Sequence, residues 1–233
     1  MGQIPMPRIV CFEGNIGAGK STAIHAISKE LQKRGFRVQT LCEPVSTWVQ
    51  CNETGTCTGR STLGNFYDNP GHYALHFQMV VLCSHHDRND SIDPDADFVL
   101  MERSPSSSIR VFSKTIHEQG HVTTKEFEAL ETFAAKIIRD RPLDTIIYLQ
   151  CAPEVAFARI HQRARPEEIQ DSGISMEYLE ELHQRHETWL IEEGGASTTF
   201  NVTNVTQNTA AYTSMCTACV HALIKPETGC SVL

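Results

Sequence analysis

The chain has 233 residues, 40% of them hydrophobic, which is enough to bury the core of one large α/β domain or at most two small ones. Its formal net charge of −8 argues against nucleic acid as a main partner, because phosphates are neutralised by a basic surface. No apolar run approaches the length that crosses a membrane, so we expect no membrane partner.

The first recognisable unit is a strand, a glycine-rich loop and a helix. Residues 8–12 are apolar and β-prone, and a helix is predicted to run to about Lys33. The loop matches G-x-x-x-x-G-K-[ST], in which backbone N–H groups and a helix N-terminus approach phosphates, Lys20 reaches the outer phosphates and Ser21 can ligate Mg²⁺. We therefore predict a nucleoside triphosphate site formed by Gly14, Asn15, Ile16, Gly17, Ala18, Gly19, Lys20, Ser21 and Thr22.

The rest of the chain alternates between strands and helices. In order, we expect a strand over 37–42, a polar surface loop over 50–62, a helix over about 73–88, an acidic connection over 87–97, a strand over 98–101, a helix capped by Thr123 and Glu126, a strand over 144–149, helices over about 154–168 and 175–192, and a strand over 199–202. The last thirty residues give no clear pattern.

This alternation predicts an α/β fold with a parallel sheet that is covered on both faces. Ligands of such sheets bind at the carboxyl ends of the strands. Glu13, Glu43 and Glu102 each follow a predicted strand directly, so we expect all three to meet near the triphosphate site.

Nine cysteines are scattered along the chain, and the N-terminal residues show neither a signal peptide's apolar core nor an Arg-rich transit segment. We therefore expect reduced thiols and a cytoplasmic location. A helix with Cys216 and Cys219 on a buried face explains this pair better than a zinc site, which needs a second pair. Residues 230–233 fit the loose prenylation pattern, but no polybasic stretch precedes them, so we expect no modification.

Several motifs, in order and at sensible spacing from about residue 8 to 192, resemble the deoxyribonucleoside kinase family, which includes virus-encoded members. They are Gly14–Thr22, Glu43-Pro44-Val45 with Trp48, Phe77-Gln78, Glu102-Arg103-Ser104, and the run from Arg159 to Glu168. The resemblance implies a P-loop kinase fold with a five-stranded parallel sheet, one kinase domain over residues 1–233, and a homodimer. It places the protein in the host cytoplasm if a virus encodes it.

The resemblance also implies that the γ-phosphoryl group of ATP is transferred to the 5′-hydroxyl of a deoxynucleoside. Glu43 matches the family's base, which accepts the proton of the hydroxyl, and Arg103 and Lys20 are the other expected catalytic residues. Because phosphoryl transfer depends on positioning and charge stabilisation, positive charge is expected from Lys20, Arg103, Arg159, Arg163 and Arg165. Ser21 and Glu102 would hold Mg²⁺ directly or through water, and the arginine series matches the family's Arg-rich lid, over about residues 159–173.

For the acceptor, the resemblance implies a site formed by Trp48, Tyr67, Phe77, Gln78, Val81, His85, Arg103, Ser108, Phe112 and Glu168. Trp48, Phe77 and Phe112 would wall the base. The Gln78 amide would meet its edge, and Tyr67 with Glu168 would hold the 3′-hydroxyl.

Base preference is expected to depend on three of these positions. His85 and Ser108 stand where deoxycytidine- and purine-preferring members carry Arg and Asp, and Val81 resembles the thymidine-accepting members. We therefore expect pyrimidines, thymidine first, and we expect the charge of His85 to change within physiological pH.

Two alternatives remain open. A nucleoside monophosphate kinase such as thymidylate kinase has a similar P-loop, but it must hold an acceptor phosphate, which Glu43 would repel. A catalytically silent nucleotide-binding subunit would not need Glu43, Lys20, Ser21, Arg103 and the lid arginines together. The position of the ATP adenine and inhibition by an end product are not indicated by the sequence.

Overall fold

The computed structural model describes residues 6–51, 57–169, 173–207 and 209–224. In this part of the chain, five parallel strands form one sheet in the order β2-β5-β1-β6-β7. The strands are β1 (Arg8–Glu13), β2 (Val38–Leu41), β5 (Phe98–Glu102), β6 (Thr145–Gln150) and β7 (Thr198–Asn201). The predicted α/β fold and its five strands are therefore confirmed.

The strand side chains alternate between two apolar layers, as the pleat of a sheet requires. On one face, Val10 and Phe12 of β1 and Leu100 of β5 pack with helix α1 (Lys20–Lys33) and helix α10 (Ala210–Ile224). On the other face, Tyr148 of β6 packs with Leu182 of helix α9 (Met176–Glu187). Burial on both faces explains why β1 is apolar without a break from Ile9 to Phe12.

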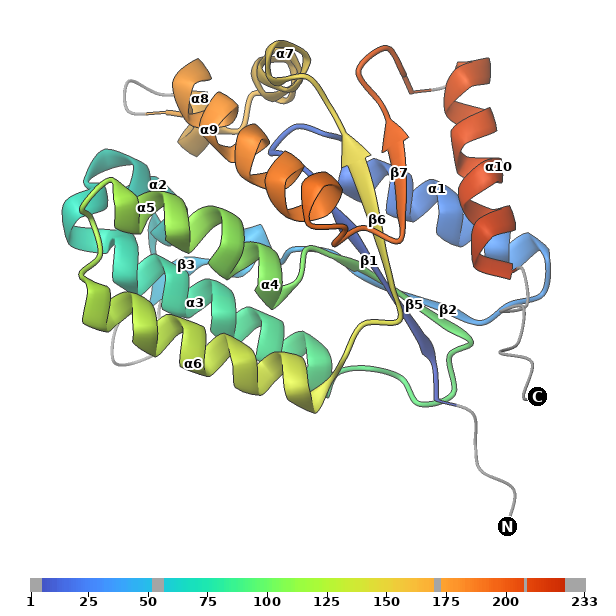
Figure 1. Cartoon of the computed structure of the whole chain (residues 1–233), viewed down its shortest axis with the longest axis horizontal. Coiled ribbons are helices and arrows are strands. Elements are labelled where there is room, and N and C mark those ends of the chain that lie inside the picture. The colour runs from blue at the N-terminus through green and yellow to red at the C-terminus, as the bar shows by residue number, and fades with distance from the viewer. Residues whose placement is uncertain (1–5, 52–56, 170–172, 208, 225–233) are drawn as a thin grey trace.

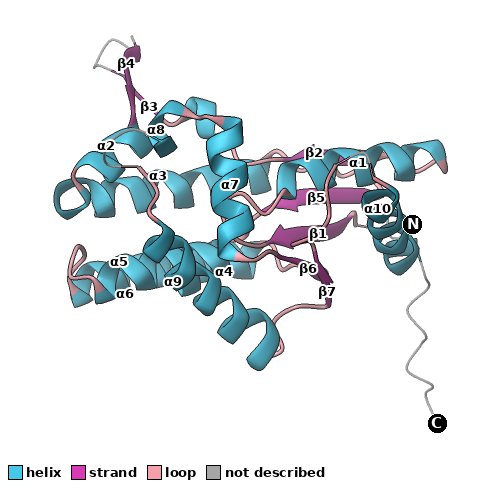
Figure 2. Ribbon diagram, turned by 90° about the horizontal axis from the view of Figure 1, so that it is seen from above, coloured by secondary structure: helices cyan, strands magenta, loops and turns pink. Residues whose placement is uncertain are grey.

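The remaining elements surround this sheet. They are α2 (Thr62–Asp68), α3 (Pro70–Asp90), α4 (Pro105–Ser107), α5 (Lys114–Glu118), α6 (Thr124–Asp140), α7 (Pro153–Arg163) and α8 (Pro166–Ile169), with a 3₁₀ turn over Val45–Thr47 and π-helical turns over Ser108–Ser113 and Thr188–Glu192. Figures 1 and 2 both show α1 beside α10 at one end of the molecule, and α2, α3, α5 and α6 gathered at the other end. The predicted Thr123–Glu126 capping box begins α6.

Two predicted segments differ from the structure. The surface loop expected over 50–62 contains two short antiparallel strands, β3 (Val49–Cys51) and β4 (Cys57–Ser61), which pair through the backbone and need no apolar pattern. The single helix expected over 154–168 is broken, because Ala164 has a left-handed φ of 55° and the residue before Pro166 is disfavoured in a helix.

Helix α10 lies in the C-terminal part that the sequence left without a pattern. Cys216 and Cys219 are both buried on α10 against the core that contains α1, which confirms the helical explanation of this pair. The helix is tied to the sheet by Arg8, which donates to the carbonyl oxygen of Leu223 at 2.6 Å, and to α1 by Tyr212, which donates to that of Thr22 at 3.0 Å.

Some expectations fall on residues that the structure does not describe: the C-terminal run 230–233 and residues 170–172 of the expected lid. Among the described residues, no helix is both long enough and apolar enough to cross a membrane.

The packing of α10 gives a stability prediction. Leu223 is 1% exposed, so Leu223→Ala should lower the free energy of unfolding by about 2–5 kcal/mol through lost burial and a residual cavity. Its neighbour His221 is exposed, and His221→Ala should change the value by less than about 0.5 kcal/mol. Urea denaturation of both variants measures the difference, and equal losses would contradict the role of this helix in the core.

Candidate active site

The loop between β1 and α1 closes tightly on itself. Gly17 has a φ of 79°, and a Cβ there would lie 2.5 Å from the carbonyl oxygen of Ala156 on α7, so glycine is required. The buried Lys20 ammonium donates to the carbonyl oxygens of Gly14 (3.2 Å) and Asn15 (2.9 Å). The loop thus encloses the Lys20 ammonium with its own carbonyl oxygens.

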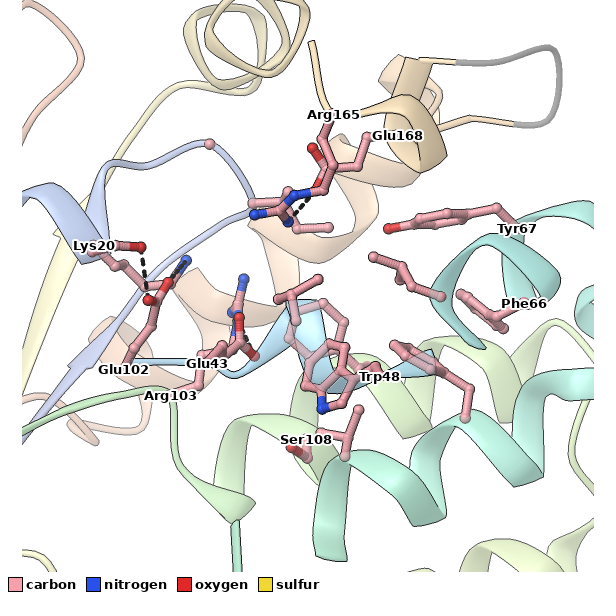
Figure 3. Close-up of a pocket in the computed structure, with 18 of the residues that line it drawn as sticks. Lys20, Glu43, Trp48, Phe66, Tyr67, Glu102, Arg103, Ser108, Arg165 and Glu168 are labelled. Atoms are coloured by element: carbon pink, nitrogen blue, oxygen red, sulfur yellow. Dashed lines mark hydrogen bonds and ion pairs between the residues drawn. The ribbon is translucent and has the colours of Figure 1, made fainter. Parts of the chain in front are cut away.

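Lys20, Ser21 and Glu102 form one polar group at the end of β5. The Ser21 hydroxyl donates to Glu102 Oε2 at 2.7 Å, and Lys20 Nζ lies 3.8 Å from Glu102 Oε1. Figure 3 shows Lys20 beside Glu102. Burial and the nearby Arg103 charge lower the pKa of Lys20 to about 8. Burial opposes ionisation of Glu102, but the Lys20 charge and the Ser21 hydrogen bond outweigh it and lower the pKa of this carboxyl group. Glu102 is therefore a carboxylate.

Glu43 follows β2 and is held by Arg103, which follows β5. Arg103 Nε lies 3.2 Å from Glu43 Oε1, and Arg103 Nη1 donates to the carbonyl oxygen of Gly14 at 2.9 Å. The guanidinium carbon also lies 4.6 Å from the centre of the Phe112 ring, a cation–π distance. Arg103 thereby joins the expected base, the P-loop and an expected wall of the acceptor site. Figure 3 shows Arg103 beside Glu43.

Glu13 also lies near this group, where its charge acts on Lys20 and Arg103, but its side chain does not face open space. Its side chain is fully buried beneath the site, where Oε1 accepts hydrogen bonds from the backbone N–H (2.9 Å) and the hydroxyl (2.5 Å) of Ser104. Burial raises the pKa of Glu13. Since β1 is the central strand, the last residue of this strand remains enclosed between its neighbours, and Glu13 positions the start of α4 instead of a ligand.

A hollow beside the P-loop brings together most of the expected acceptor residues. Its lining includes Trp48, Tyr67, Phe77, Gln78, Val81, Arg103, Ser108, Phe112 and Glu168, together with Lys20, Ser21, Glu43 and Glu102. Aromatic rings form one wall: Trp48 meets Phe77 edge to face at 5.5 Å between centroids, and Phe77 stacks on Phe66 at 5.0 Å. A flat apolar ring system fits between such walls.

Polar groups reach this hollow from α3 and from the π-helical turn Ser108–Ser113, which follows α4. The Ser113 hydroxyl donates to Gln78 Oε1 at 3.1 Å, which fixes the orientation of the Gln78 amide. His85 was expected to face the base, but among the described residues it is not part of the lining; it lies behind Ser108, 3.0 Å from its hydroxyl. Burial and the charges of Arg88 and Arg103 lower the pKa of His85 well below its ordinary value, so the expected change of charge at physiological pH is wrong.

The expected sugar pair and two expected lid arginines lie together. Glu168 is 3% exposed and accepts hydrogen bonds from Arg163 Nη2 (2.5 Å) and Arg165 Nη1 (2.9 Å). Tyr67 lines the same hollow, and Figure 3 shows its hydroxyl directed toward the Arg165–Glu168 pair. Burial raises the pKa of Tyr67 well above its ordinary value, so the phenol keeps its proton and can donate it in a hydrogen bond.

A second hollow adjoins the first. The two hollows share a wall that consists of Gly17, Lys20, Ser21, Glu102, Arg163 and Arg165. The lining of the second hollow alone includes Ala18, Gly19, Thr22, Arg159, Gln162, Thr203, Thr206, Gln207, Tyr212 and Met215. Arg159 Nη2 donates to the carbonyl oxygens of Val202 (3.0 Å) and Val205 (2.9 Å), so it also holds the segment after β7. The Asn15 side chain is turned toward α9, where it donates to the carbonyl oxygen of Leu179 at 2.9 Å.

Sequence reasoning missed several residues of both hollows. Leu63 and Phe66 recur at helical spacing with Tyr67 on α2, a signal in the sequence that would have extended the acceptor wall. Tyr178 on α9 and the segment of residues 203–207 reach the site only through the fold, because nothing in their local pattern distinguishes them from core or loop residues.

A model of the deoxynucleoside kinase family matches residues 10–221. This chain belongs to that family. Among curated relatives of the kinase, thymidine kinase of Ictalurid herpesvirus 1 is 33% identical over 190 residues, 80% of this chain and 76% of that protein. Thymidine kinase 2, mitochondrial, of Homo sapiens is 33% identical over 187 residues, 79% of this chain and 64% of that protein. Deoxycytidine kinase 2 of Gallus gallus is 30% identical over 211 residues, 80% of this chain and 75% of that protein.

As a deoxynucleoside kinase, the protein is an ATP-dependent enzyme that phosphorylates deoxynucleosides. The match covers all five strands of the sheet except the first two residues of β1, so the P-loop, both hollows and most of α10 lie inside it.

Proposed function

We propose that this kinase transfers the γ-phosphoryl group of ATP to the 5′-hydroxyl of a pyrimidine deoxynucleoside, thymidine first. The observation that carries the proposal is the pair of adjoining hollows with Lys20, Ser21, Glu102, Arg163 and Arg165 in their shared wall. Two substrates that bind one on each side of these residues would meet at a group of positive charges and a P-loop, which is what in-line phosphoryl transfer needs.

Glu43 is proposed as the general base. Its side chain is 17% exposed at the hollow, and Arg103 orients it through a contact at 3.2 Å. A carboxylate there can accept the proton of a bound 5′-hydroxyl as the oxygen attacks. Arg103 can then stabilise negative charge on the transferred group from the side of the acceptor, while Lys20 does so from the side of the P-loop.

Ser21 and Glu102 are proposed to hold Mg²⁺. They fit the ion because both offer oxygen atoms, which Mg²⁺ prefers, and the two side chains already touch at 2.7 Å. Bound Mg²⁺ neutralises charge on the β- and γ-phosphates. The carboxylate of Glu102 is kept ionised by Lys20, and this prepares the pair for a cation.

The segment of about residues 159–173 is proposed as a lid, of which residues 170–172 lie outside the described chain. Arg163 and Arg165 line both hollows and form ion pairs with Glu168. Glu168 lines the first hollow, the one with Trp48 and Phe77 in its wall, which we call the acceptor hollow. A nucleoside whose 3′-hydroxyl binds Tyr67 and Glu168 would therefore change the surroundings of the two arginines that face the phosphates. Arg159 would contact the phosphates from the second hollow, where the residues after β7 would surround the adenine.

The preference for thymidine has support from the site and from the relatives. Val81 and Ser108 are small and line the hollow, which leaves room beside a 5-methyl group. Two of the three relatives described above are thymidine kinases by name and the third is a deoxycytidine kinase, so both pyrimidines remain candidates. A thymidylate kinase is disfavoured because Glu43 would repel an acceptor phosphate, and a silent subunit is disfavoured by the intact group of Glu43, Arg103, Lys20 and Ser21.

Other expectations stay predictions. These are the single domain over residues 1–233, the homodimer, the cytoplasmic location and the lack of nucleic-acid and membrane partners. Thymidine kinase 2 of Homo sapiens and deoxyguanosine kinase of Xenopus laevis carry the word mitochondrial in their names.

The base assignment is tested by Glu43→Gln, which keeps the shape of the side chain and removes the proton acceptor. We expect kcat to fall by roughly 10²–10⁴ while the Kd for the nucleoside changes much less. Glu180→Gln on the exposed surface of α9 is the control and should behave as wild type. A near-normal kcat in Glu43→Gln would remove Glu43 from this role.

The lid is tested by Arg163→Ala and Arg165→Ala. Because the proposed targets of these arginines are phosphates whose charge develops in the transition state, kcat should fall more than nucleoside affinity. Single-turnover kinetics measures kcat, and calorimetry measures the affinity for the nucleoside. Arg139→Ala, at an exposed position of α6, is the matched control. A loss of nucleoside affinity with unchanged kcat speaks against a lid.

The sugar contacts are tested with 3′-deoxythymidine. Removal of the 3′-hydroxyl leaves the Tyr67 hydroxyl without the ligand oxygen and takes one hydrogen bond from Glu168, at a cost of about 1–3 kcal/mol, so this substrate should be used about 5- to 150-fold less well than thymidine. In Tyr67→Phe this gap should shrink, whereas Tyr73→Phe, on α3 outside the lining of the hollow, should keep it. An undiminished gap in Tyr67→Phe would exclude the contact.

A further inference from the structure

A buried arginine that the proposed mechanism does not use lies between the ends of two strands. Arg88 on α3 is 7% exposed, and among the described residues it is not part of the lining of either hollow. Its Nη1 donates to the carbonyl oxygens of Leu41 (3.2 Å) and Glu102 (2.6 Å), the last residues of β2 and β5. Its Nε donates to the carbonyl oxygen of Ser84 (3.4 Å), and its Nη2 faces Nδ1 of His85. One guanidinium therefore joins α3 to the ends of both strands.

The two carbonyl groups lie where the pairing of β2 with β5 ends. The last pair in the register of these strands joins Leu41 to Met101, whereas β5 continues beside β1 as far as the pair of Phe12 with Glu102. A carbonyl oxygen at such a point needs a donor from elsewhere, because the neighbouring strand no longer offers one. Arg88 supplies this donor to both strands, so the two chains can diverge beyond it without losing hydrogen bonds.

One of these carbonyl groups belongs to the peptide unit that leads into Arg103. Arg88 holds the Glu102 carbonyl oxygen of this unit, and the Arg103 N–H at its other end donates to the carbonyl oxygen of Phe12 on β1 at 3.1 Å. The orientation of the peptide is thus fixed from both sides. Arg103 follows it with a left-handed φ of 59°, a conformation that an arginine keeps only where its surroundings hold it.

The other carbonyl group lies on the path of the chain to Glu43. It belongs to Leu41, two residues before Glu43, and Arg88 holds it at 3.2 Å. The Glu43 carboxylate then lies 3.2 Å from Arg103 Nε, so both members of this pair follow backbone that the same guanidinium fixes. Burial lowers the pKa of Arg88, but a guanidinium keeps its charge in proteins, and the charge of Glu43 opposes the shift.

We propose that Arg88 is a positioning residue for phosphoryl transfer, which sets the separation between Glu43 and Arg103 by holding the ends of β2 and β5. The proposal rests on the proposed function, in which Glu43 accepts the proton of the hydroxyl and Arg103 stabilises the transferred group. Arg88 acts through the backbone and not on a substrate. A displacement of about 1 Å in reacting groups can cost about 100-fold in rate, so its loss should slow the chemical step. The affinity for the nucleoside should change little, because other side chains form the walls of the acceptor hollow.

The experiment compares Arg88→Met, which removes the donors and the charge, with Arg88→Lys, which keeps a charge and several donors. Single-turnover kinetics with Mg-ATP measures the rate of phosphoryl transfer to thymidine, and calorimetry measures the Kd for thymidine. Arg88→Met should lower the rate about 10- to 100-fold and change the Kd by less than about threefold. Arg88→Lys should return the rate to within about threefold of the wild type, because an ammonium can donate to both carbonyl oxygens.

Two controls separate positioning from a loss of stability. Arg110→Met makes the same substitution at an exposed arginine and should behave as wild type. Leu223→Ala is expected to lose stability through α10, yet it should keep the wild-type rate at temperatures below its melting transition. Thermal melting of each variant checks folding. If Arg88→Met does not fold, Arg88→Gln takes its place in the comparison with Arg88→Lys, because its shorter side chain ends before the two carbonyl groups.

A double-mutant cycle tests whether the effect of Arg88 passes through Glu43. In Glu43→Gln, the carboxylate that Arg88 is proposed to position is already missing. The factor by which Arg88→Met lowers the rate should therefore be at least about threefold smaller in the Glu43→Gln background than in the wild type.

The outcomes separate this proposal from the function beneath it. The positioning role is overturned by an unchanged rate in Arg88→Met, by equal losses in Arg88→Met and Arg88→Lys, or by a loss that is confined to the Kd for thymidine. Independent effects in the double-mutant cycle would also overturn it. A near-normal rate in Glu43→Gln would instead remove the proposed base, and failure of the wild type to phosphorylate any pyrimidine deoxynucleoside would overturn the proposed function.

Discussion

Much of the site depends on where one guanidinium is held. Arg103 contacts the Glu43 carboxylate, the carbonyl oxygen of Gly14 and the ring of Phe112, and so connects three segments that lie far apart in the sequence. It does so from a left-handed backbone conformation, with φ at 59°, which costs an ordinary residue free energy and persists only when its surroundings impose it. Here parallel pairing with β1 and β2 holds the end of β5, and the backbone N–H of Arg103 donates to the carbonyl oxygen of Phe12 at 3.1 Å.

The features that the sequence predicted well are those with a local cause. Strands β1, β5 and β6 contain apolar runs, the P-loop has a fixed spacing, and the cap of α6 lies within four residues, so each is visible without knowledge of the fold. Glu13 shows the limit of this reasoning. Its place after a strand suggested a ligand-facing carboxylate, but only the strand order shows that β1 is central and that this side chain is enclosed.

The candidate site was predictable to a similar extent. Trp48, Tyr67, Phe77 and Gln78 were found only because their spacing resembles that of a family, since an aromatic residue on a helix is otherwise indistinguishable from core. The charge state of His85 was not predictable at all. Its pKa depends on burial and on Arg88, three residues on, whose guanidinium could as well have faced solvent in an isolated helix.

The shared wall between the two hollows divides the site into parts with different freedom to change. If ATP and the nucleoside bind in the two hollows as proposed, a substitution at Lys20, Ser21 or Glu102 disturbs both substrates, and we expect it to abolish the reaction and not merely the use of one substrate. Val81 and Ser108 line only the acceptor hollow, and substitutions there can alter which base is accepted while the phosphate chemistry stays intact. In a fold arranged in this way, substitutions that are confined to the acceptor hollow can change the accepted substrate, and no intermediate sequence needs to lose catalysis.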